Sequence, residues 1–255
     1  MNEKLLYLIK YLLNENPRYR DIQIPDNETD RFNLYRSLVN IRAASDADAE
    51  YLKTEDALLK EISKEKGVVD IAGLEPIEKN IRLWQGDITR LKCGAIVNAA
   101  NSGMTGCYQP CHNCIDNCIH TFAGTRLRYK CNQIMLVQGH AEPTGKAKIT
   151  PAYNLPCDYV IHTVGPIVQG RLTKEHCDLL ESSYRSCLEL ATATGIKSIA
   201  FCCISTGVFG FPQKDAAEIA VRTVREFQKE HEIEVIFNVF KTEDYAIYKR
   251  LLGAN

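Results

Sequence analysis

Short apolar runs alternate with longer amphipathic segments through most of the chain after residue 80. Runs rich in valine, isoleucine and aromatic residues predict β-strands at 81–85, 95–99, 159–164, 198–204 and 234–240. Segments with helical periodicity lie between or after them, at 115–133, 174–194, 213–229 and 243–252. This alternation predicts a three-layer α/β/α domain with a mixed central sheet, which we place at residues 73–255.

The first part of the chain, residues 1–72, predicts a helical extension instead. Apolar residues recur at helical spacing near the start, and Pro17 and Pro25 interrupt the pattern. A second apolar stripe begins at Phe32, and a third follows a predicted N-cap at Ser45. We expect three helices whose apolar faces form a core, and no residue of this extension carries recognisable chemistry.

Charge, hydropathy and cysteine content exclude several classes of protein. A net charge of −1 offers no large basic surface, so we expect no nucleic-acid partner. No run approaches the roughly 18 apolar residues that span a membrane, and the N-terminus lacks a signal-peptide pattern. Eleven cysteines in a chain of 255 residues do not fit a small disulfide-stapled domain. These features predict a cytoplasmic protein without a membrane partner, and we expect a monomer.

One short segment concentrates the residues that bind metals. CYQPCHNCIDNCIH contains Cys107, Cys111, His112, Cys114, Cys118 and His120. Thiolate and imidazole are zinc ligands, and three protein ligands leave the fourth position free, as in catalytic zinc sites. We therefore predict a Zn²⁺ site in this loop, the alternatives being buried free cysteines or an adventitious disulfide.

Two histidines are predicted to lie in the hydrophobic core. His120 has Ile119 and Phe122 as neighbours, and His162 lies in the predicted strand at 159–164. Apolar neighbours favour a buried, hydrogen-bonded His120 over a metal ligand, and a strand core position for His162.

Three polar clusters each follow a predicted strand. They are GDIT at 86–89, NAANSG at 98–103 and STGVFG at 205–210. Ligands bind at the carboxyl ends of parallel strands, so we expect these clusters to line one crevice with the metal loop at its mouth. The glycine-rich cluster precedes a predicted helix and suits a diphosphate, although it is not a Walker A loop.

Individual residues of these segments have more than one interpretation. Asp87 either caps a turn or accepts a hydrogen bond from a ligand. Asn98 and Asn101 either fill turns or recognise ribose hydroxyls, and their spacing suits side chains that reach opposite sides of the strand exit. Asp116, on the same helical face as His120, either orients water beside a metal or is a favourable charge at a helix N-terminus.

Together these segments resemble a macrodomain, the ADP-ribose-binding α/β fold. LWQGDIT, AIVNAANS, CIDNCIHTFAG, GKAKITPAYNLPCDYVIHTVGP and STGVFGFP occur in the order and spacing of that family, over about residues 81–252. Most macrodomains have a glycine-rich loop where this chain has GCYQPCHNC, and this loop is similar to that of the zinc-containing macrodomains of bacteria and fungi. Their helical N-terminal extension also resembles residues 1–72.

The resemblance implies hydrolysis of the bond between ADP-ribose and a modified protein side chain. Asp87 and Ile88 would hold the adenine, with Phe240 packed on it, and Asn98 and Asn101 would line the ribose end. The diphosphate would be wrapped by Ser205, Thr206, Gly207, Val208, Phe209 and Gly210, with Phe209 near the proximal ribose.

The resemblance also assigns the metal ligands and the catalytic residues. Cys107, His112 and Cys114 match the three zinc ligands of the zinc-containing macrodomains. Asp116 matches the acid that many hydrolytic macrodomains carry at the start of this helix, and Asn101 is the second predicted catalytic residue. The additional cysteines, Cys111 and Cys118, leave the ligand set open.

Two other functions use the same pocket. One is a non-catalytic reader of ADP-ribosylated protein, and the other is an esterase that deacetylates O-acetyl-ADP-ribose. Members of this family are often associated with sirtuin-like ADP-ribosyltransferases and lipoyl-carrier proteins. The resemblance therefore implies an ADP-ribosylated protein as the partner, and such a lipoyl carrier as a candidate substrate.

Overall fold

The central sheet of the computed structural model, which describes residues 1–253, has parallel strands in its interior and antiparallel strands at its edges. From edge to edge it runs through β2 (Pro76–Glu78), β3 (Ile81–Gln85), β9 (Glu234–Val239), β8 (Ser198–Phe201), β5 (Ala95–Ala99), β7 (Tyr159–Thr163) and β6 (Ala147–Pro151). β2 and β6 are antiparallel to their neighbours, and the other pairs are parallel. A separate parallel pair joins β1 (Val69–Asp70) to β4 (Leu91–Lys92). The prediction of a mixed sheet is confirmed.

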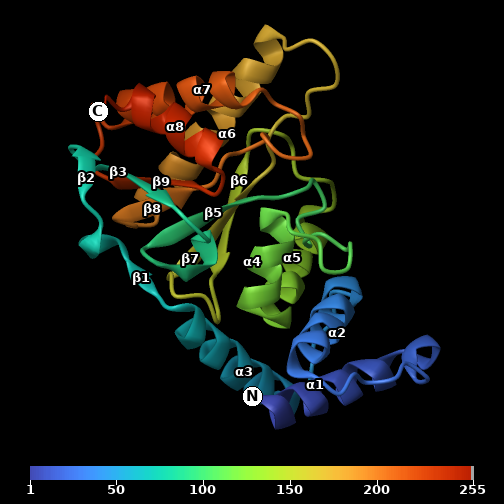
Figure 1. Cartoon of the computed structure of the whole chain (residues 1–255). Helices are drawn as coiled ribbons and strands as arrows, with labels where there is room; N and C mark the ends of the chain where they lie inside the picture. Colours follow the sequence, from blue (N-terminus) through green and yellow to red (C-terminus); the bar gives the residue numbers. More distant parts are fainter. Residues whose placement is uncertain (254–255) are drawn as a thin grey trace.

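Helices cover both faces of this sheet (Figure 1). One layer contains α6 (Lys174–Ala193), α7 (Gln213–Phe227) and α8 (Thr242–Leu251), and the opposite layer contains α4 (Ile115–Ala123) and α5 (Thr125–Gln138). The predicted three-layer α/β/α architecture is therefore confirmed.

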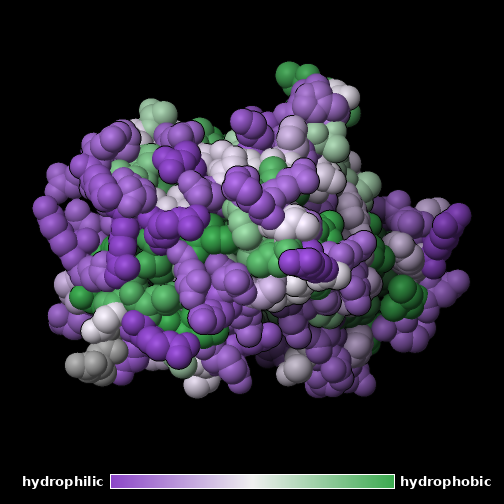
Figure 2. All heavy atoms as spheres, turned by 90° about the horizontal axis from the view of Figure 1, so that it is seen from above, coloured by the Kyte–Doolittle hydropathy of each residue, from purple (hydrophilic) through white to green (hydrophobic). Residues whose placement is uncertain are grey.

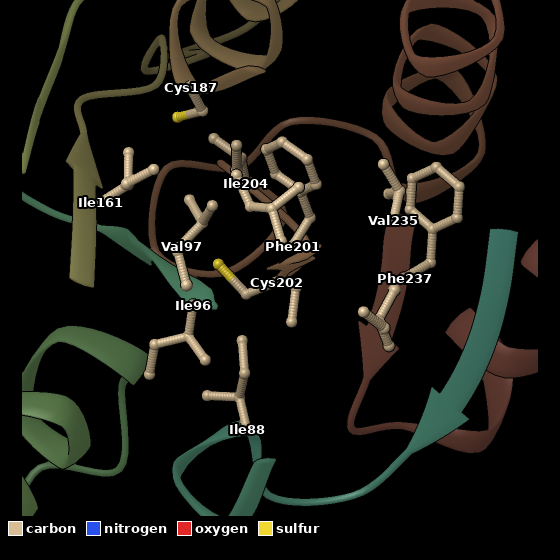
Figure 3. Close-up of a cluster of buried hydrophobic side chains, with 14 of the residues drawn as sticks. Ile88, Ile96, Val97, Ile161, Cys187, Phe201, Cys202, Ile204, Val235 and Phe237 are labelled. Atoms are coloured by element: carbon tan, nitrogen blue, oxygen red, sulfur yellow. The ribbon is translucent and has the colours of Figure 1, made fainter. Parts of the chain in front are cut away.

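The core of the sheet is apolar on both faces (Figure 3). Ile96 and Val97, successive residues of β5, are fully buried and extend toward opposite faces. Phe201 of β8 and Phe237 of β9 belong to the same buried cluster. Strands that are covered on both faces read as continuous apolar runs, which is why the sequence marks them clearly.

Three helices form the N-terminal extension: α1 (Asn2–Glu15), α2 (Glu28–Ile41) and α3 (Ala49–Lys66). Their buried side chains, such as Leu8 and Tyr35, form a hydrophobic cluster separate from that of the sheet. α2 and α3 pack against α4. The cap of α3 is Asp48, whose carboxylate accepts a hydrogen bond from the backbone N–H of Tyr51, so the prediction of a cap at Ser45 was wrong. The boundary between residues 72 and 73 stays a prediction.

A glycine divides the segment that the sequence predicts as one helix at 115–133. α4 ends at Ala123 and α5 begins at Thr125, and Gly124 between them has a φ of +94°. A Cβ at Gly124 would lie 2.8 Å from the Glu55 Oε2 atom of α3, so this position also lacks room for a side chain. The helical pattern continues across the break, which is why the single-helix prediction was wrong.

The face of the molecule seen in Figure 2 is mainly polar, with smaller hydrophobic areas between the hydrophilic residues. Within residues 1–253, no helix has both the length and the apolar character needed to span a membrane. All eleven cysteines lie in the described part of the chain, and all are free thiols. Packing in the hydrophobic clusters, not disulfides between these cysteines, therefore stabilises the fold.

Candidate active site and metal centre

The three polar clusters lie at one end of the sheet, beyond the carboxyl ends of its parallel strands. β3, β5 and β8 belong to its parallel part, so their carboxyl ends point the same way. The loops after them carry Asp87, Asn101 and Ser205, respectively. Predicted ligand-binding residues from distant parts of the sequence are thus placed along the edge where such sheets bind ligands.

Asp87 caps a short 3-10 turn and also pairs with the extension. Its Oδ1 accepts hydrogen bonds from the Thr89 backbone N–H (3.0 Å) and hydroxyl (2.6 Å), and its Oδ2 lies 2.5 Å from the Lys66 Nζ of α3. Burial raises the pKa of Asp87, but the contacts with Lys66 and Thr89 outweigh burial and hold that pKa below its ordinary value. The neighbouring residue Ile88 is 1% exposed, so it offers almost no surface to a ligand in this structure.

An exposed aromatic ring lies at the same end of the sheet. Phe240 follows β9, and its side chain is 77% exposed. Its carbonyl accepts a hydrogen bond of 3.3 Å from Nε2 of Gln85, the last residue of β3, which places it near the segment that carries Asp87. A planar ligand could stack on this ring while it contacts the carboxylate.

Asp116, in the first turn of α4, accepts hydrogen bonds from two asparagines. The Asn98 Nδ2 lies 2.8 Å from its Oδ1, and the Asn101 Nδ2 lies 3.2 Å from its Oδ2. The prediction that the two asparagines reach opposite sides was wrong, because the chain turns after β5 and brings both amides to one carboxylate. Burial raises the pKa of Asp116 to about 6 against the opposing effect of Asn98, Arg128 and Asn101.

The two asparagines differ in burial. Asn98 is fully buried, and its Nδ2 also lies 3.1 Å from Nδ1 of His162, whose Nε2 is 2.9 Å from the Thr150 hydroxyl. Asn101 is half-buried. Asn98 therefore supports the carboxylate from inside the fold, and Asn101 is the one that a ribose could reach. The prediction that His162 is a strand core residue is confirmed.

His120 is buried as predicted, but its ring is not hydrogen-bonded. Neither ring nitrogen has a hydrogen-bond partner within residues 1–253, which corrects the expectation of a hydrogen-bonded imidazole. Burial is the main cause that lowers the pKa of His120 well below its ordinary value. The ring borders a cavity of about 10 Å³, the space of one water molecule.

The predicted zinc ligands come together in the loop between β5 and α4. Ligand atoms of Cys107, His112 and Cys114 all lie within 4.8 Å of one another, and the Cys107 Sγ is 3.7 Å from the His112 Nδ1. Zinc binds sulfur and nitrogen at about 2.0–2.3 Å in a tetrahedron, which puts neighbouring ligand atoms about 3.5–4 Å apart. Two thiols and one imidazole at this spacing fit a zinc ion with its fourth position open.

The other two thiols of this segment face α2. The Cys111 Sγ lies 3.2 Å from the Ser37 hydroxyl oxygen, and the Cys118 Sγ lies 3.7 Å from the Arg36 Nη2. Neither belongs to the group of three ligand atoms. This geometry favours the predicted ligand set, which stays a prediction.

The glycine-rich loop after β8 has the form of an anion cradle. Ser205 and Gly210 adopt left-handed backbone conformations with φ of +65° and +71°. Across the described residues, hydrogen-bond acceptors are absent for the Ser205 hydroxyl and for the backbone N–H groups of Gly207, Val208 and Phe209. Free amides in such a turn are suited to phosphate oxygens. α7 begins only at Gln213, so its N-terminus lies beyond the turn rather than within it.

One side chain of this loop stabilises the turn, and two others are accessible to a ligand. The Thr206 hydroxyl donates a 3.0 Å hydrogen bond to the carbonyl of Cys203, so it stabilises the turn. Val208 is 81% exposed, and Phe209 is half-buried. A ligand would thus meet the main chain of the loop and the apolar side chains of Val208 and Phe209.

Comparison with known proteins identifies the family. A family model described as "Macro domain" matches residues 97–220. A protein-ADP-ribose hydrolase of Treponema medium is 55% identical over 98% of both chains, and one of Staphylococcus aureus (strain MRSA252) is 49% identical over 94% of this chain and 93% of that protein. This chain belongs to the macrodomain family. The fold is similar to that of a Trypanosoma brucei macrodomain solved in complex with ADP-ribose, with a TM-score of 0.66 and 31% sequence identity. The match covers 90% of this chain and 97% of the T. brucei chain.

Three residues near the site of this macrodomain were not identified from the sequence. Lys66 and Arg36 belong to the extension, where no motif marks them, and they meet the site only through tertiary packing. Asn117 lies inside the CIDNCIH segment, so its place in this motif could have identified it as a site residue. Its buried amide donates hydrogen bonds to the carbonyls of Gln109 (2.9 Å) and Cys107 (3.4 Å) in the metal loop.

Proposed function

We propose that this macrodomain is a zinc-dependent hydrolase that removes mono-ADP-ribose from modified protein side chains. The observation that carries the proposal is the direct link between the ligand loop and the catalytic pair. The Asn101 Nδ2, which contacts Asp116, also donates a 3.1 Å hydrogen bond to the carbonyl of Gly106, the residue before Cys107. The names of the full-length relatives support the reaction class.

Binding would be divided along the edge of the sheet. Asp87 and the exposed ring of Phe240 would receive the adenine, and the free amides after Ser205 would receive the diphosphate. These contacts lie away from the bond that breaks, so they would supply positioning rather than chemistry. Asn101, being half-buried beside the metal loop, would contact the distal ribose.

The chemistry would fall to Asp116 and Asn101. Two lone-pair sites of the Asp116 carboxylate are taken by asparagine amides, and a carboxylate offers about four, so it can still accept a hydrogen bond from a water. Asp116 would orient this water and take its proton as the water oxygen adds to the anomeric carbon. The protein side chain would leave with the electron pair of the broken bond and take up the proton that Asp116 received from the water. A zinc ion held by Cys107, His112 and Cys114 would supply Lewis acidity toward oxygen.

The proposed substrate is an ADP-ribosylated protein. The likeness to zinc-containing macrodomains makes a lipoyl-carrier protein, modified by a sirtuin-like ADP-ribosyltransferase, the first substrate to test. Proteins modified on aspartate, glutamate, serine and arginine would define the linkage that is cleaved.

The decisive experiment measures ADP-ribose release from these proteins in single turnover, together with the metal content of the enzyme. We expect about one zinc per chain and loss of both metal and turnover in Cys107→Ala, His112→Ala and Cys114→Ala. Cys177→Ala, on α6, is the matched control and should retain both. Full zinc retention in all three ligand variants would reassign the site to Cys111 or Cys118.

The rival functions give different outcomes in the same assays. A reader would bind ADP-ribosylated protein without releasing ADP-ribose. An O-acetyl-ADP-ribose deacetylase would release acetate from the free ester and leave modified proteins intact. Turnover by the zinc-free enzyme at the wild-type rate would show that the metal is structural and that the proposed zinc dependence is wrong.

A further inference from the structure

One face of α2 lies against the loop that carries the proposed zinc ligands. Arg36, Ser37 and Asn40 occupy neighbouring positions on this helix. Arg36 contacts His112, Ser37 contacts Cys111, and Asn40 contacts both Cys111 and Thr121. We call these three residues the α2 brace and residues 107–114 the metal loop. The brace belongs to the extension, whereas the metal loop follows β5 in the sheet domain.

Arg36 makes the central contacts of the brace. Its Nη2 donates hydrogen bonds to the His112 carbonyl (2.7 Å) and to the Asn117 Oδ1 (3.0 Å), and its Nη1 lies 3.4 Å from the Asn113 Oδ1. A planar guanidinium presents several donors in a fixed geometry, so these contacts fix a direction as well as a distance. The main chain that carries the His112 imidazole is therefore held by a residue of α2.

Asn117 connects Arg36 to the rest of the metal loop. Its Oδ1 accepts from Arg36, while its Nδ2 donates to the carbonyls of Gln109 and Cys107. Asn117 is fully buried in the first turns of α4, so its amide has a fixed position. The backbone at Cys107 and at His112 is thereby held by one hydrogen-bonded network that begins on α2.

Asn40 and Ser37 hold the middle of the metal loop. Cys111 has a φ of +53°, a left-handed conformation that is unfavourable for a residue with a side chain. Its backbone N–H donates a 2.9 Å hydrogen bond to the Asn40 Oδ1, and its Sγ lies 3.2 Å from the Ser37 hydroxyl. The Asn40 Nδ2 in turn donates to the Thr121 hydroxyl (3.0 Å), which anchors this contact on α4.

We propose that the α2 brace holds the metal loop in its metal-binding conformation, with Arg36 as a positioning residue that acts on the zinc site through the His112 carbonyl and Asn117. The inference rests on the proposed function for the presence of the metal. It adds a role for the extension, namely control of metal retention. Partners beyond the ligands orient metal-binding side chains, and their loss typically weakens metal affinity by about 10–100-fold.

The test compares Arg36→Ala with Arg31→Ala in the cobalt-substituted protein. Arg31 lies on the same helix, but its side chain donates to the Pro25 carbonyl and the Asn2 side chain instead of the metal loop. We expect cobalt transfer to a chelator about 10–100-fold faster in Arg36→Ala, with an altered thiolate-to-cobalt absorption band, and wild-type behaviour in Arg31→Ala. Equal release rates and spectra in wild type and Arg36→Ala would overturn the proposal.

Arg36→Lys keeps the test decisive if Arg36→Ala fails to fold. Lysine retains the charge, but its single nitrogen lacks the planar, two-nitrogen geometry with which Arg36 also reaches the Asn113 Oδ1, so we expect an intermediate release rate. Wild-type release from a folded Arg36→Lys would contradict the guanidinium network.

The failures of the two proposals are distinguishable. A wild-type protein that binds cobalt but hydrolyses no ADP-ribosyl bond would contradict the proposed function and leave the brace standing if Arg36→Ala still releases metal faster. Wild-type protein that binds no metal at this loop would contradict both.

Discussion

Lys66 and Asp87 form an ion pair that joins the helical extension to the proposed ligand site. The Lys66 Nζ at the end of α3 lies 2.5 Å from the Asp87 Oδ2 and 3.7 Å from the centre of the Phe122 ring on α4. Asp87 also caps the turn that follows β3 through Thr89. The carboxylate assigned to the adenine is thus held from two sides, and its possible roles in stability and in ligand binding must be separated.

Asp87→Ala should weaken ADP-ribose binding more than Lys66→Met does. If the Asp87 carboxylate accepts a hydrogen bond from the ligand, its loss leaves a buried donor unpaired, which costs about 1–3 kcal/mol of binding free energy. In Lys66→Met the carboxylate stays in place, because Thr89 still holds its Oδ1. Calorimetric titration of both variants with free ADP-ribose measures the two affinities.

The outcomes separate ligand contact from capping. Unchanged affinity in Asp87→Ala would mean that this residue only caps its turn. Equal losses in the two variants would mean that Asp87 acts chiefly as the counter-ion of Lys66. Both variants should keep the release rate of bound cobalt, because neither residue contacts the metal loop.

Glu55 makes a second junction between the extension and the sheet domain. Its Oε2 accepts hydrogen bonds of 2.9 Å from both the backbone N–H and the hydroxyl of Thr125, and its Oε1 accepts from the hydroxyls of Tyr35 (2.9 Å) and Tyr51 (3.1 Å). Glu55→Ala should lower the free energy of unfolding by about 3 kcal/mol or more, because it leaves these buried donors unpaired. Urea denaturation measures the change, with the exposed Glu50→Ala of the same helix as the control.

The same residue predicts a pH dependence with a defined sign. Burial raises the pKa of Glu55 above its ordinary value of 4.5, against the lowering effect of its hydrogen bonds. Its contribution to stability is therefore present below about pH 4.5 and is lost as the pH rises through the folded-state pKa. Glu55→Gln does not titrate, and its amide can donate to the two tyrosine hydroxyls. Wild type should lose stability relative to Glu55→Gln as the pH rises above about 4.5 and through the raised folded-state pKa of Glu55, and a constant difference would contradict the prediction.

The elements of the fold were predictable where burial produces a clear apolar pattern in the sequence. Strands such as β5 and β9 are covered on both faces, so their apolar runs predict them almost residue by residue. The edge strand β6 was missed, because only Thr150 among its residues is buried and the apolar pattern is correspondingly weak. The break at Gly124 was missed because the helical pattern continues across it, and the Glu55 carboxylate that contacts Thr125 there lies about seventy residues away in sequence.

The site was predictable only as a set of residue types. The spacing of Cys107, His112 and Cys114 within one loop indicated a metal, since loop residues meet locally. The convergence of Asn98 and Asn101 on Asp116 depends on how the chain turns after β5, and the contacts of Arg36 depend on how the extension packs against α4. Such tertiary relationships leave no periodicity or motif in a single sequence.

Asp116→Asn should slow hydrolysis without a comparable loss of ADP-ribose affinity. The substitution removes the negative charge and one acceptor oxygen from the carboxylate that faces Asn98 and Asn101, while the adenine and diphosphate contacts lie elsewhere on the sheet edge. If Asp116 takes the proton of the attacking water, turnover should fall by about 10²–10⁴-fold. Single-turnover release of ADP-ribose from a modified protein measures the rate, and calorimetry with free ADP-ribose checks binding in parallel.

A control variant and a second measurement distinguish a catalytic effect of Asp116→Asn from misfolding. Asp158→Asn exchanges an exposed aspartate immediately before β7 and should leave the rate unchanged. Asp116→Asn should also retain its cobalt absorption band, because Asp116 is not one of the three proposed ligands. A folded, metal-loaded Asp116→Asn with the wild-type rate would remove Asp116 from the reaction, since the proton would then have to leave by another route. A variant that loses binding and turnover together would instead show that the carboxylate holds the asparagines of the ribose site and that its contribution is positional.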